Sequence, residues 1–254
     1  MVEALFWPAA LGYGEAALAY ATVRTSRLAT WGVRLGWLAQ TALLAVQAER
    51  AEGFPWASWS GSLNLFVWLV VGAYLIWGCR PRYRLLGLGV MPLAAILFVV
   101  ARLAGGTGDH GSGSGYGSAF LVLHVGAVLA AFAGFTLAAG LAGVYLWQER
   151  RLKRRDAGIL RLRLPPLASL ERLASRTIGV SLVLLTVGLA AGLVRARDDG
   201  GRFDALEAVT VLTWLVYGGF VVTRPGGRRA AYLALGGFAL VILARLALAG
   251  GHFA

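Results

Sequence analysis

The stretch Phe120-Leu-Val-Leu-His-Val-Gly-Ala-Val-Leu-Ala-Ala-Phe132 is an apolar run that one histidine interrupts. It belongs to a longer apolar segment, 119–147, which exceeds the roughly 20 residues that a helix needs to cross a bilayer. Similar runs recur along the chain, separated by short basic segments. Hydrophobic residues make up 58% of the sequence and charged residues only 14%, against about 45–50% and about 25% in soluble domains. The sequence therefore predicts an all-α, polytopic transmembrane helical bundle.

The apolar runs divide the chain into predicted spans separated by charged segments. Seventeen of the 24 Lys and Arg residues lie on alternate segments, which orients the protein by the positive-inside rule. The formal charge of +12 therefore needs no nucleic-acid partner. We expect a single integral membrane domain over 1–254, embedded in the lipid bilayer of a bacterial cytoplasmic (inner) membrane, with both termini extracytoplasmic. The eight predicted spans are 4–22, 29–47, 63–79, 85–104, 119–147, 177–195, 205–222 and 231–249.

Two connecting segments have distinct compositions. Residues 105–118 are rich in glycine and predict a flexible external loop. Residues 148–176 predict a basic cytoplasmic loop with an interfacial helix, because the leucines at 167, 170 and 173 form one apolar stripe. The same loop is also a candidate docking surface for a cytoplasmic partner.

Charged residues also lie inside or near the ends of the predicted spans. Glu15 and Arg34 fall at similar depth in the first two spans, so we expect them to form an ion pair; a proton relay would need more ionisable groups. Arg102 and Arg245 lie near the external ends of the fourth and eighth spans, where either snorkelling or an anion bound at that face would explain them.

Two of the three histidines reach the same membrane level. His124 lies about five residues inside the external end of the fifth span, and His252 follows the eighth. A lone histidine there is a polar boundary residue, but a pair of neutral imidazoles can supply both axial ligands of a heme iron. The cations available to the heme propionates are Arg245, Arg102, Arg195, Arg197 and Arg202. A zinc site with Asp109, His110, Asp198, Asp199 or Asp204 matches no compact zinc motif.

Several segments, in order, resemble one protein family. Leu123–Phe132, the run Leu146-Trp-Gln-Glu-Arg-Arg-Leu-Lys-Arg154, and Leu164–Leu173 are similar to the CcsA/CcmC/HemX superfamily of cytochrome c assembly membrane proteins. Ser62–Leu75 resembles its early helix hairpin, and Val211–Tyr217 and Gly250–Phe253 resemble its last two spans. The resemblance covers about 60–254. It implies heme handling at the outer membrane face, with axial histidines that map onto His124 and His252.

One motif departs from the family pattern. Heme-delivering members carry a tryptophan-rich segment that runs into Trp-Asp-Pro-Lys-Glu, whereas this chain has Arg202-Phe-Asp-Ala-Leu-Glu207. Asp204 and Glu207 match the motif, and Asp204 is therefore grouped with the predicted cofactor-binding residues. Loss of the tryptophans, proline and lysine favours the HemX-like branch, whose members are associated with control of a heme-biosynthesis enzyme.

These observations give three functional hypotheses. The first is a protein that binds heme b and handles or delivers it in cytochrome c biogenesis, together with an assembly partner subunit and apocytochrome c. The second is a HemX-like regulator or scaffold that acts through segment 148–176. The third, a small-molecule transporter, lacks internal repeats and midplane binding groups. We expect no catalytic residues and, at most, a subunit of a heme-attachment system.

Overall fold

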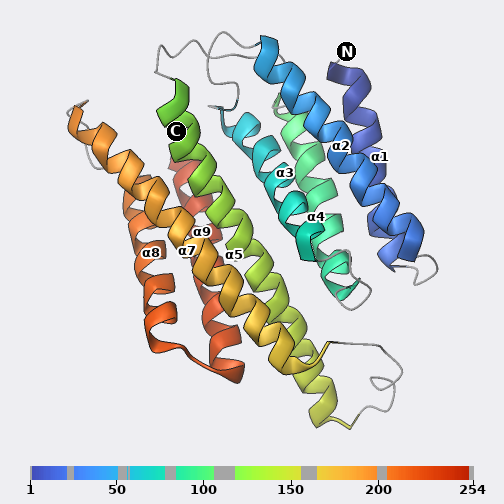
Figure 1. The fold of residues 1–254 in the computed structure, drawn as a ribbon, viewed down its shortest axis with the longest axis vertical. Coiled ribbons are helices and arrows are strands. Elements are labelled where there is room, and N and C mark those ends of the chain that lie inside the picture. Colours follow the sequence, from blue (N-terminus) through green and yellow to red (C-terminus); the bar gives the residue numbers. More distant parts are fainter. Residues whose placement is uncertain are drawn as a thin grey trace. The chain divides into compact units, whose positions relative to one another are not determined.

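Helices account for the regular structure of the protein in a computed structural model (Figure 1). It describes residues 2–21, 26–50, 56, 58–77, 84–105, 118–155, 165–198 and 205–251, and the side chains of most of these. Within these ranges there are eight α-helices and no strand. The helices are α1 (Val2–Ala21), α2 (Ser26–Arg50), α3 (Trp59–Trp77), α4 (Arg84–Leu103), α5 (Ser118–Lys153), α7 (Leu167–Asp198), α8 (Ala205–Thr223) and α9 (Gly227–Gly251).

Each of the eight predicted spans falls on one helix, so the predicted all-α fold is confirmed for the described residues. Four helical segments there are long and apolar enough to cross a membrane: Trp59–Ile76, Leu86–Leu103, Val122–Lys153 and Leu167–Val194. Helix α8 adds a shorter apolar segment, Glu207–Thr223. The number of spans and the orientation of the termini stay predictions.

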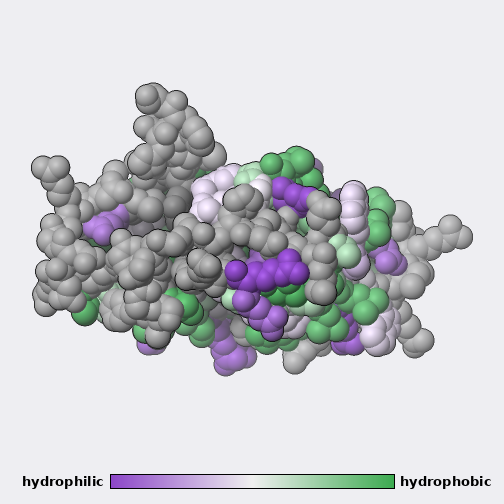
Figure 2. All heavy atoms as spheres, turned by 90° about the horizontal axis from the view of Figure 1, so that it is seen from above, coloured by the Kyte–Doolittle hydropathy of each residue, from purple (hydrophilic) through white to green (hydrophobic). Residues whose placement is uncertain are grey.

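Large apolar side chains point away from the helix packing in both halves of the chain. Trp7, Leu103 and Val222 are 64%, 82% and 83% exposed, and hydrophobic atoms reach the surface in Figure 2. A soluble protein would bury most such side chains, whereas lipid solvates them at no cost. The exposed apolar surface is therefore what a membrane protein requires.

The helices form two units, Met1–Val122 and Leu123–Ala254. In unit 1, α1 and α3 each pack on both α2 and α4. Glycine allows the closest approach: a Cβ on Gly12 of α1 would lie 2.7 Å from the Gly32 carbonyl oxygen and 2.9 Å from the Gly36 Cα on α2. Small residues of this kind let two helix backbones touch, as is common in membrane helices.

A buried polar network joins α1, α2 and α3 in unit 1. The Tyr13 hydroxyl donates to Gln40 Oε1 at 2.5 Å, and Gln40 Nε2 donates to Asn64 Oδ1 at 2.8 Å and to the Asn64 carbonyl at 3.0 Å. Asn64 Nδ2 then donates to Gln47 Oε1 at 3.3 Å. All four side chains are buried, so these bonds replace the water that the groups lose.

The predicted Glu15–Arg34 ion pair is wrong in this structure. Both residues are described, and no ion pair joins them; both side chains are exposed. The Arg34 guanidinium lies 5.6 Å from the centre of the Trp31 ring on its own helix. The side chain stacks along α2 and does not reach across to α1.

In unit 2, α7 packs on α8 and α9, and α8 packs on α9. Phe135 of α5 stacks on Tyr217 of α8 with ring centres 3.9 Å apart, and the Tyr217 hydroxyl donates to the Ala234 carbonyl of α9 at 3.2 Å. Helices α5 and α7 meet through small residues: a Cβ on Gly134 would collide with Ser181 Oγ. The core of this unit is thus formed by aromatic stacking and close backbone approach.

Helices α5 and α7 are longer than a bilayer requires. They contain 36 and 32 residues, or about 54 and about 48 Å at 1.5 Å per residue, against a hydrocarbon core of about 30 Å. Residues 167–173, the predicted interfacial helix, form the first turns of α7 and not a separate element. The described part of the predicted loop 148–176 is therefore mostly helical, and its placement at the inner membrane face stays a prediction.

Candidate functional site

His124 lies in the second turn of α5 and is half-buried. Its Nδ1 is 2.7 Å from the carbonyl oxygen of Gly188 on α7. A carbonyl oxygen only accepts hydrogen bonds, so Nδ1 carries the proton and donates it. In a neutral imidazole Nε2 is then the nitrogen without a proton, and its lone pair can bind a ligand.

Two glycines of α7 make room for this arrangement. A Cβ on Gly192 would lie 2.7 Å from His124 Cε1 and 3.1 Å from Nδ1, and a Cβ on Gly188 would lie 2.6 Å from Val128 Cγ2. Residues four apart share one face of a helix, so Gly188 and Gly192 together form the surface on which α5 and the imidazole rest. A larger residue at either position would push α5 or the ring away.

The state of His124 fits a metal-ligating imidazole. Such histidines are neutral, and their second ring nitrogen usually donates to a carbonyl or carboxylate, which fixes the tautomer and the ring orientation. The hydrogen bond to Gly188 does this for His124. The residue can therefore hold a heme iron through Nε2.

The structure describes only part of the other predicted site residues. His252, Arg202 and Asp204 lie outside the described residues, and so does the side chain of Arg245, whose backbone belongs to α9. That His124 and His252 face one another therefore stays a prediction. The alternative zinc ligands also lie outside, by residue or by side chain: Asp109, His110, Asp198, Asp199 and Asp204.

Arg102, the remaining predicted site residue, belongs to the last turn of α4 in unit 1. Its guanidinium carbon lies 5.7 Å from the centre of the Phe6 ring of α1. No cluster of three or more His, Cys, Asp or Glu residues that could hold a metal ion occurs in the described part of the chain. Among the described residues, His124 is therefore the candidate ligand of the heme iron.

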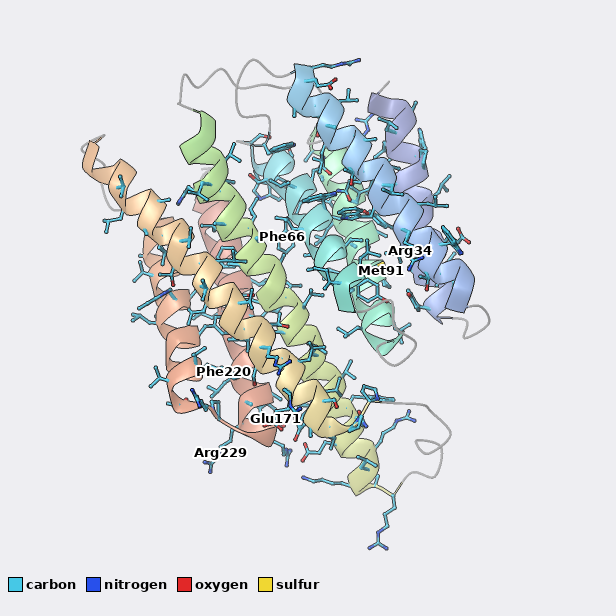
Figure 3. The ribbon with its side chains drawn as sticks, viewed as in Figure 1. Arg34, Phe66, Met91, Glu171, Phe220 and Arg229 are labelled. Atoms are coloured by element: carbon cyan, nitrogen blue, oxygen red, sulfur yellow. The ribbon has the colours of Figure 1, made fainter. Side chains whose placement is uncertain are left out.

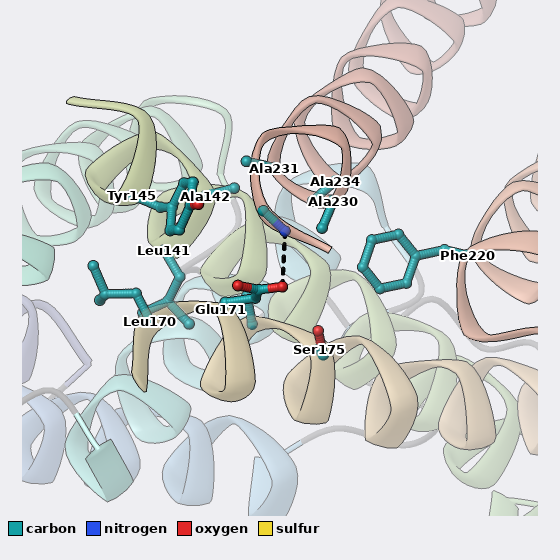
Figure 4. A pocket seen from close by; sticks show the side chains of 12 residues that line it. Leu141, Ala142, Tyr145, Leu170, Glu171, Ser175, Phe220, Ala230, Ala231 and Ala234 are labelled. Atoms are coloured by element: carbon teal, nitrogen blue, oxygen red, sulfur yellow. Dashed lines mark hydrogen bonds between the residues drawn. The ribbon is translucent and has the colours of Figure 1, made fainter. Parts of the chain in front are cut away.

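A second polar site, which the sequence did not predict, lies where α5 ends and α7 and α9 begin. Glu171 of α7 accepts a hydrogen bond from the Gly227 backbone N–H at 2.8 Å and so caps the first turn of α9 (Figure 4). The hollow around Glu171 is otherwise mainly apolar, lined by Leu141, Tyr145, Leu170 and Phe220 among others. The carboxylate stabilises the positive N-terminal end of the helix dipole.

Charged residues surround this end of unit 2. Glu149 of α5 pairs with Lys153 at 2.8 Å and with Arg228 of α9 at 3.2 Å. A hydrogen bond with Tyr232, followed by the charge of Glu149, raises the pKa of Arg228. Arg151 lies over the Trp147 ring at 4.8 Å. Gln148 Nε2 also donates to the Pro165 carbonyl at 3.1 Å. These contacts hold the described part of the predicted basic segment at the end of α5 and at the start of α7.

Comparison with known proteins follows the same segments. A family model described as "Cytochrome C assembly protein" matches residues 56–249, which is most of the chain and includes His124. The chain belongs to the cytochrome c assembly protein family. The resemblance that the sequence motifs indicated is therefore confirmed.

Individual relatives of this cytochrome c assembly protein are named as cytochrome c biogenesis proteins. The cytochrome c biogenesis protein CcsA of Gloeothece citriformis is 27% identical over 84% of this chain and 82% of its own length. CcsA of Guillardia theta is 24% identical over 91% and 79%. CcsA of Synechococcus sp. RCC307 is 30% identical, but this match spans 49% of each chain. These relatives support a role in cytochrome c biogenesis, and the family implies heme handling within a membrane assembly.

Proposed function

We propose that this protein binds heme in cytochrome c biogenesis, with Nε2 of His124 and an imidazole nitrogen of His252 as the two axial ligands. The observation that carries the proposal is the 2.7 Å contact between His124 Nδ1 and the Gly188 carbonyl. This bond places the proton of a neutral imidazole on Nδ1, which leaves Nε2 as the nitrogen that would ligate the iron. Heme is the cofactor that cytochrome c maturation passes to an apocytochrome.

The protein groups have separate tasks in this proposal. The Gly188 carbonyl holds the proton on Nδ1, Gly192 leaves space for the ring, and the half-buried position limits access of water. Arg245 and Arg202 would pair with the anionic propionates, because guanidinium groups bind carboxylates through two hydrogen bonds. Asp204 stays a predicted cofactor-binding residue. Arg102, which packs on Phe6 in unit 1, stays a predicted propionate partner.

The same proposal sets the orientation in the membrane. Basic segments between spans face the cytoplasm by the positive-inside rule, so both termini and the His124 end of α5 face outward. Heme handling then takes place at the outer face of a bacterial cytoplasmic membrane, beside an assembly partner subunit and apocytochrome c. The basic end around Glu149 and Glu171 faces inward.

The second hypothesis, a HemX-like regulator of a heme-biosynthesis enzyme, is less well supported. The compared relatives are named as cytochrome c biogenesis proteins and match across most of the chain. This favours the first proposal. A regulator would bind its enzyme through segment 148–176 and would keep that activity after loss of His124.

The test is an optical spectrum of the detergent-purified protein, expressed with sufficient heme. We expect a bis-histidine heme spectrum in the wild type, its loss in His124→Ala and His252→Ala, and partial recovery in both variants on addition of imidazole. His110→Ala is the matched control, because it removes the third histidine and should leave the spectrum unchanged. A wild type that stays colourless and refuses added heme would contradict the proposal.

A further inference from the structure

Glu15 and Arg34 place two opposite charges on the outer surface of unit 1. Glu15 lies on α1, and its Oε2 would be 3.6 Å from a Cβ on Gly32 of α2. Arg34 lies two residues from Gly32 and is labelled in Figure 3. The two charges therefore lie at nearly the same level of the α1–α2 pair, and both side chains are exposed.

The residues around these charges form an outward-facing apolar surface. On α1, Leu11 and Leu18 flank Glu15 and are 67% and 69% exposed; on α2, Trp31 and Leu38 flank Arg34 and are 58% and 57% exposed. Lipid covers such apolar side chains without penalty. The exposed leucines therefore do not by themselves indicate a protein partner. The two charges do need a partner.

Among the described residues of one copy, neither charge has an ion-pair partner. No hydrogen bond or ion pair of the Glu15 carboxylate occurs among the described contacts, and Arg34 has only the ring of Trp31. An ionised side chain inside the hydrocarbon region is costly unless it is paired or faces a polar cavity. This cost applies to both residues if α1 and α2 cross the membrane as proposed.

We propose that the α1–α2 face, defined by Leu11, Glu15, Leu18, Trp31, Arg34 and Leu38, is a dimer interface occupied by a second copy of the chain. A two-fold axis pairs residue i of one copy with residue j of the other and j with i. Glu15 of each copy then meets Arg34 of the other, and two ion pairs neutralise all four charges. One carboxylate and one guanidinium at a common level make the face self-complementary.

The close approach of α1 and α2 suits this role. Gly12 lies against Gly32 and Gly36, so the two helix backbones approach closely at this point and their exposed faces lie next to one another. The proposal goes beyond heme binding, because no residue of the interface belongs to the candidate heme site.

Charge exchange between two differently tagged copies tests the proposal. The variants are Glu15→Arg and Arg34→Glu, each in its own chain, expressed either alone or with the other. The measurement is the fraction of one tag that co-purifies with the other in mild detergent. Each variant expressed alone should self-associate about tenfold or more weakly than the wild type, because like charges then face one another across the axis. Co-expression of the two variants should restore association, since both contacts in that mixed pair are again between opposite charges.

Leu11→Ala is the matched control on the same face, and it should keep most of the association. Elution as a single species and unchanged helicity by circular dichroism show that each variant folds. Unchanged association in both single variants would overturn the proposal. That result is expected if the two charged side chains only extend to the membrane surface. Loss of association in the single variants without recovery in the mixed pair would also overturn it and would point to a different partner subunit. Heme content should not change in any of these variants.

Discussion

In unit 1 the buried amide of Gln40 uses both its oxygen and its nitrogen in hydrogen bonds, whereas in unit 2 the imidazole of His124 uses Nδ1 alone among the described contacts. The first arrangement satisfies every polar atom of the side chain and joins three helices. The second fixes a ring and leaves Nε2 without a hydrogen bond from the described residues. A buried polar residue therefore indicates a ligand only when its hydrogen bonds leave a donor or acceptor unused.

Replacement of Gln40 should give the largest change in stability. Gln40→Leu leaves the Tyr13 hydroxyl and Asn64 Oδ1 buried without this partner, at about 1–3 kcal/mol per group, so we expect a loss of about 2–6 kcal/mol in the free energy of unfolding. Denaturant titration followed by circular dichroism in detergent measures it. Heme binding in the folded variant should not change.

Gln148→Leu is the matched variant in unit 2. Gln148 donates one hydrogen bond to Pro165, and its Oε1 is buried without a partner among the described residues. Its replacement by leucine removes that unsatisfied atom together with the bond, so the loss should be at most about 1 kcal/mol. Equal losses for Gln40→Leu and Gln148→Leu would contradict the difference between the two units.

Alanine at Gly192 sharpens the comparison at the heme site. The new methyl group would lie 2.7 Å from His124 Cε1, which forces the ring to move away from Gly188 and misplaces Nε2. We expect heme affinity to fall about tenfold, equivalent to about 1.4 kcal/mol. Gly179→Ala on the same helix is the control, since no atom lies within 4 Å of a Cβ there. Equal heme titrations for the two variants would show that the ring position does not matter.

Removal of the charge at Glu149 should have the smallest effect. Glu149 is only 14% exposed, but its partners Lys153 and Arg228 are 60% and 49% exposed, so solvent screens both ion pairs and they contribute about 0–1 kcal/mol. Glu149→Gln should therefore lower stability by less than about 1 kcal/mol, and the difference should shrink in high salt. A loss of stability as large as that of Gln40→Leu would contradict this expectation. It would mean that the ion pairs stabilise unit 2 as strongly as the buried amide hydrogen bonds stabilise unit 1.

The sequence predicted the helices well because hydrophobic runs long enough for a bilayer leave few alternatives. It placed one helix at each of eight apolar segments, and the structure has a helix at each. It treated residues 167–173 as a separate interfacial helix, although no proline or glycine breaks the chain between them and the following span. The helix therefore continues as α7.

The polar contacts were harder to predict, because they depend on which faces of the helices meet. Charged residues in the spans led to the prediction that Glu15 pairs with Arg34, but both side chains are exposed and no ion pair joins them. The uncharged Gln40, Gln47 and Asn64 were not part of this prediction, although Gln40 and Gln47 are seven residues apart and share a helix face. His124 was identified from its rarity, but its Gly188 partner was not; the Gly188–Gly192 spacing on α7 was the available signal.

The reduction potential of the bound heme in a His124→Met variant tests the central claim most directly. If Nε2 of His124 ligates the iron, a methionine at this position changes the ligand pair from His/His to His/Met and should raise the potential. The same change should be visible in the optical spectrum of the oxidised protein. A variant that binds heme with the potential and spectrum of the wild type would show that His124 is not an axial ligand.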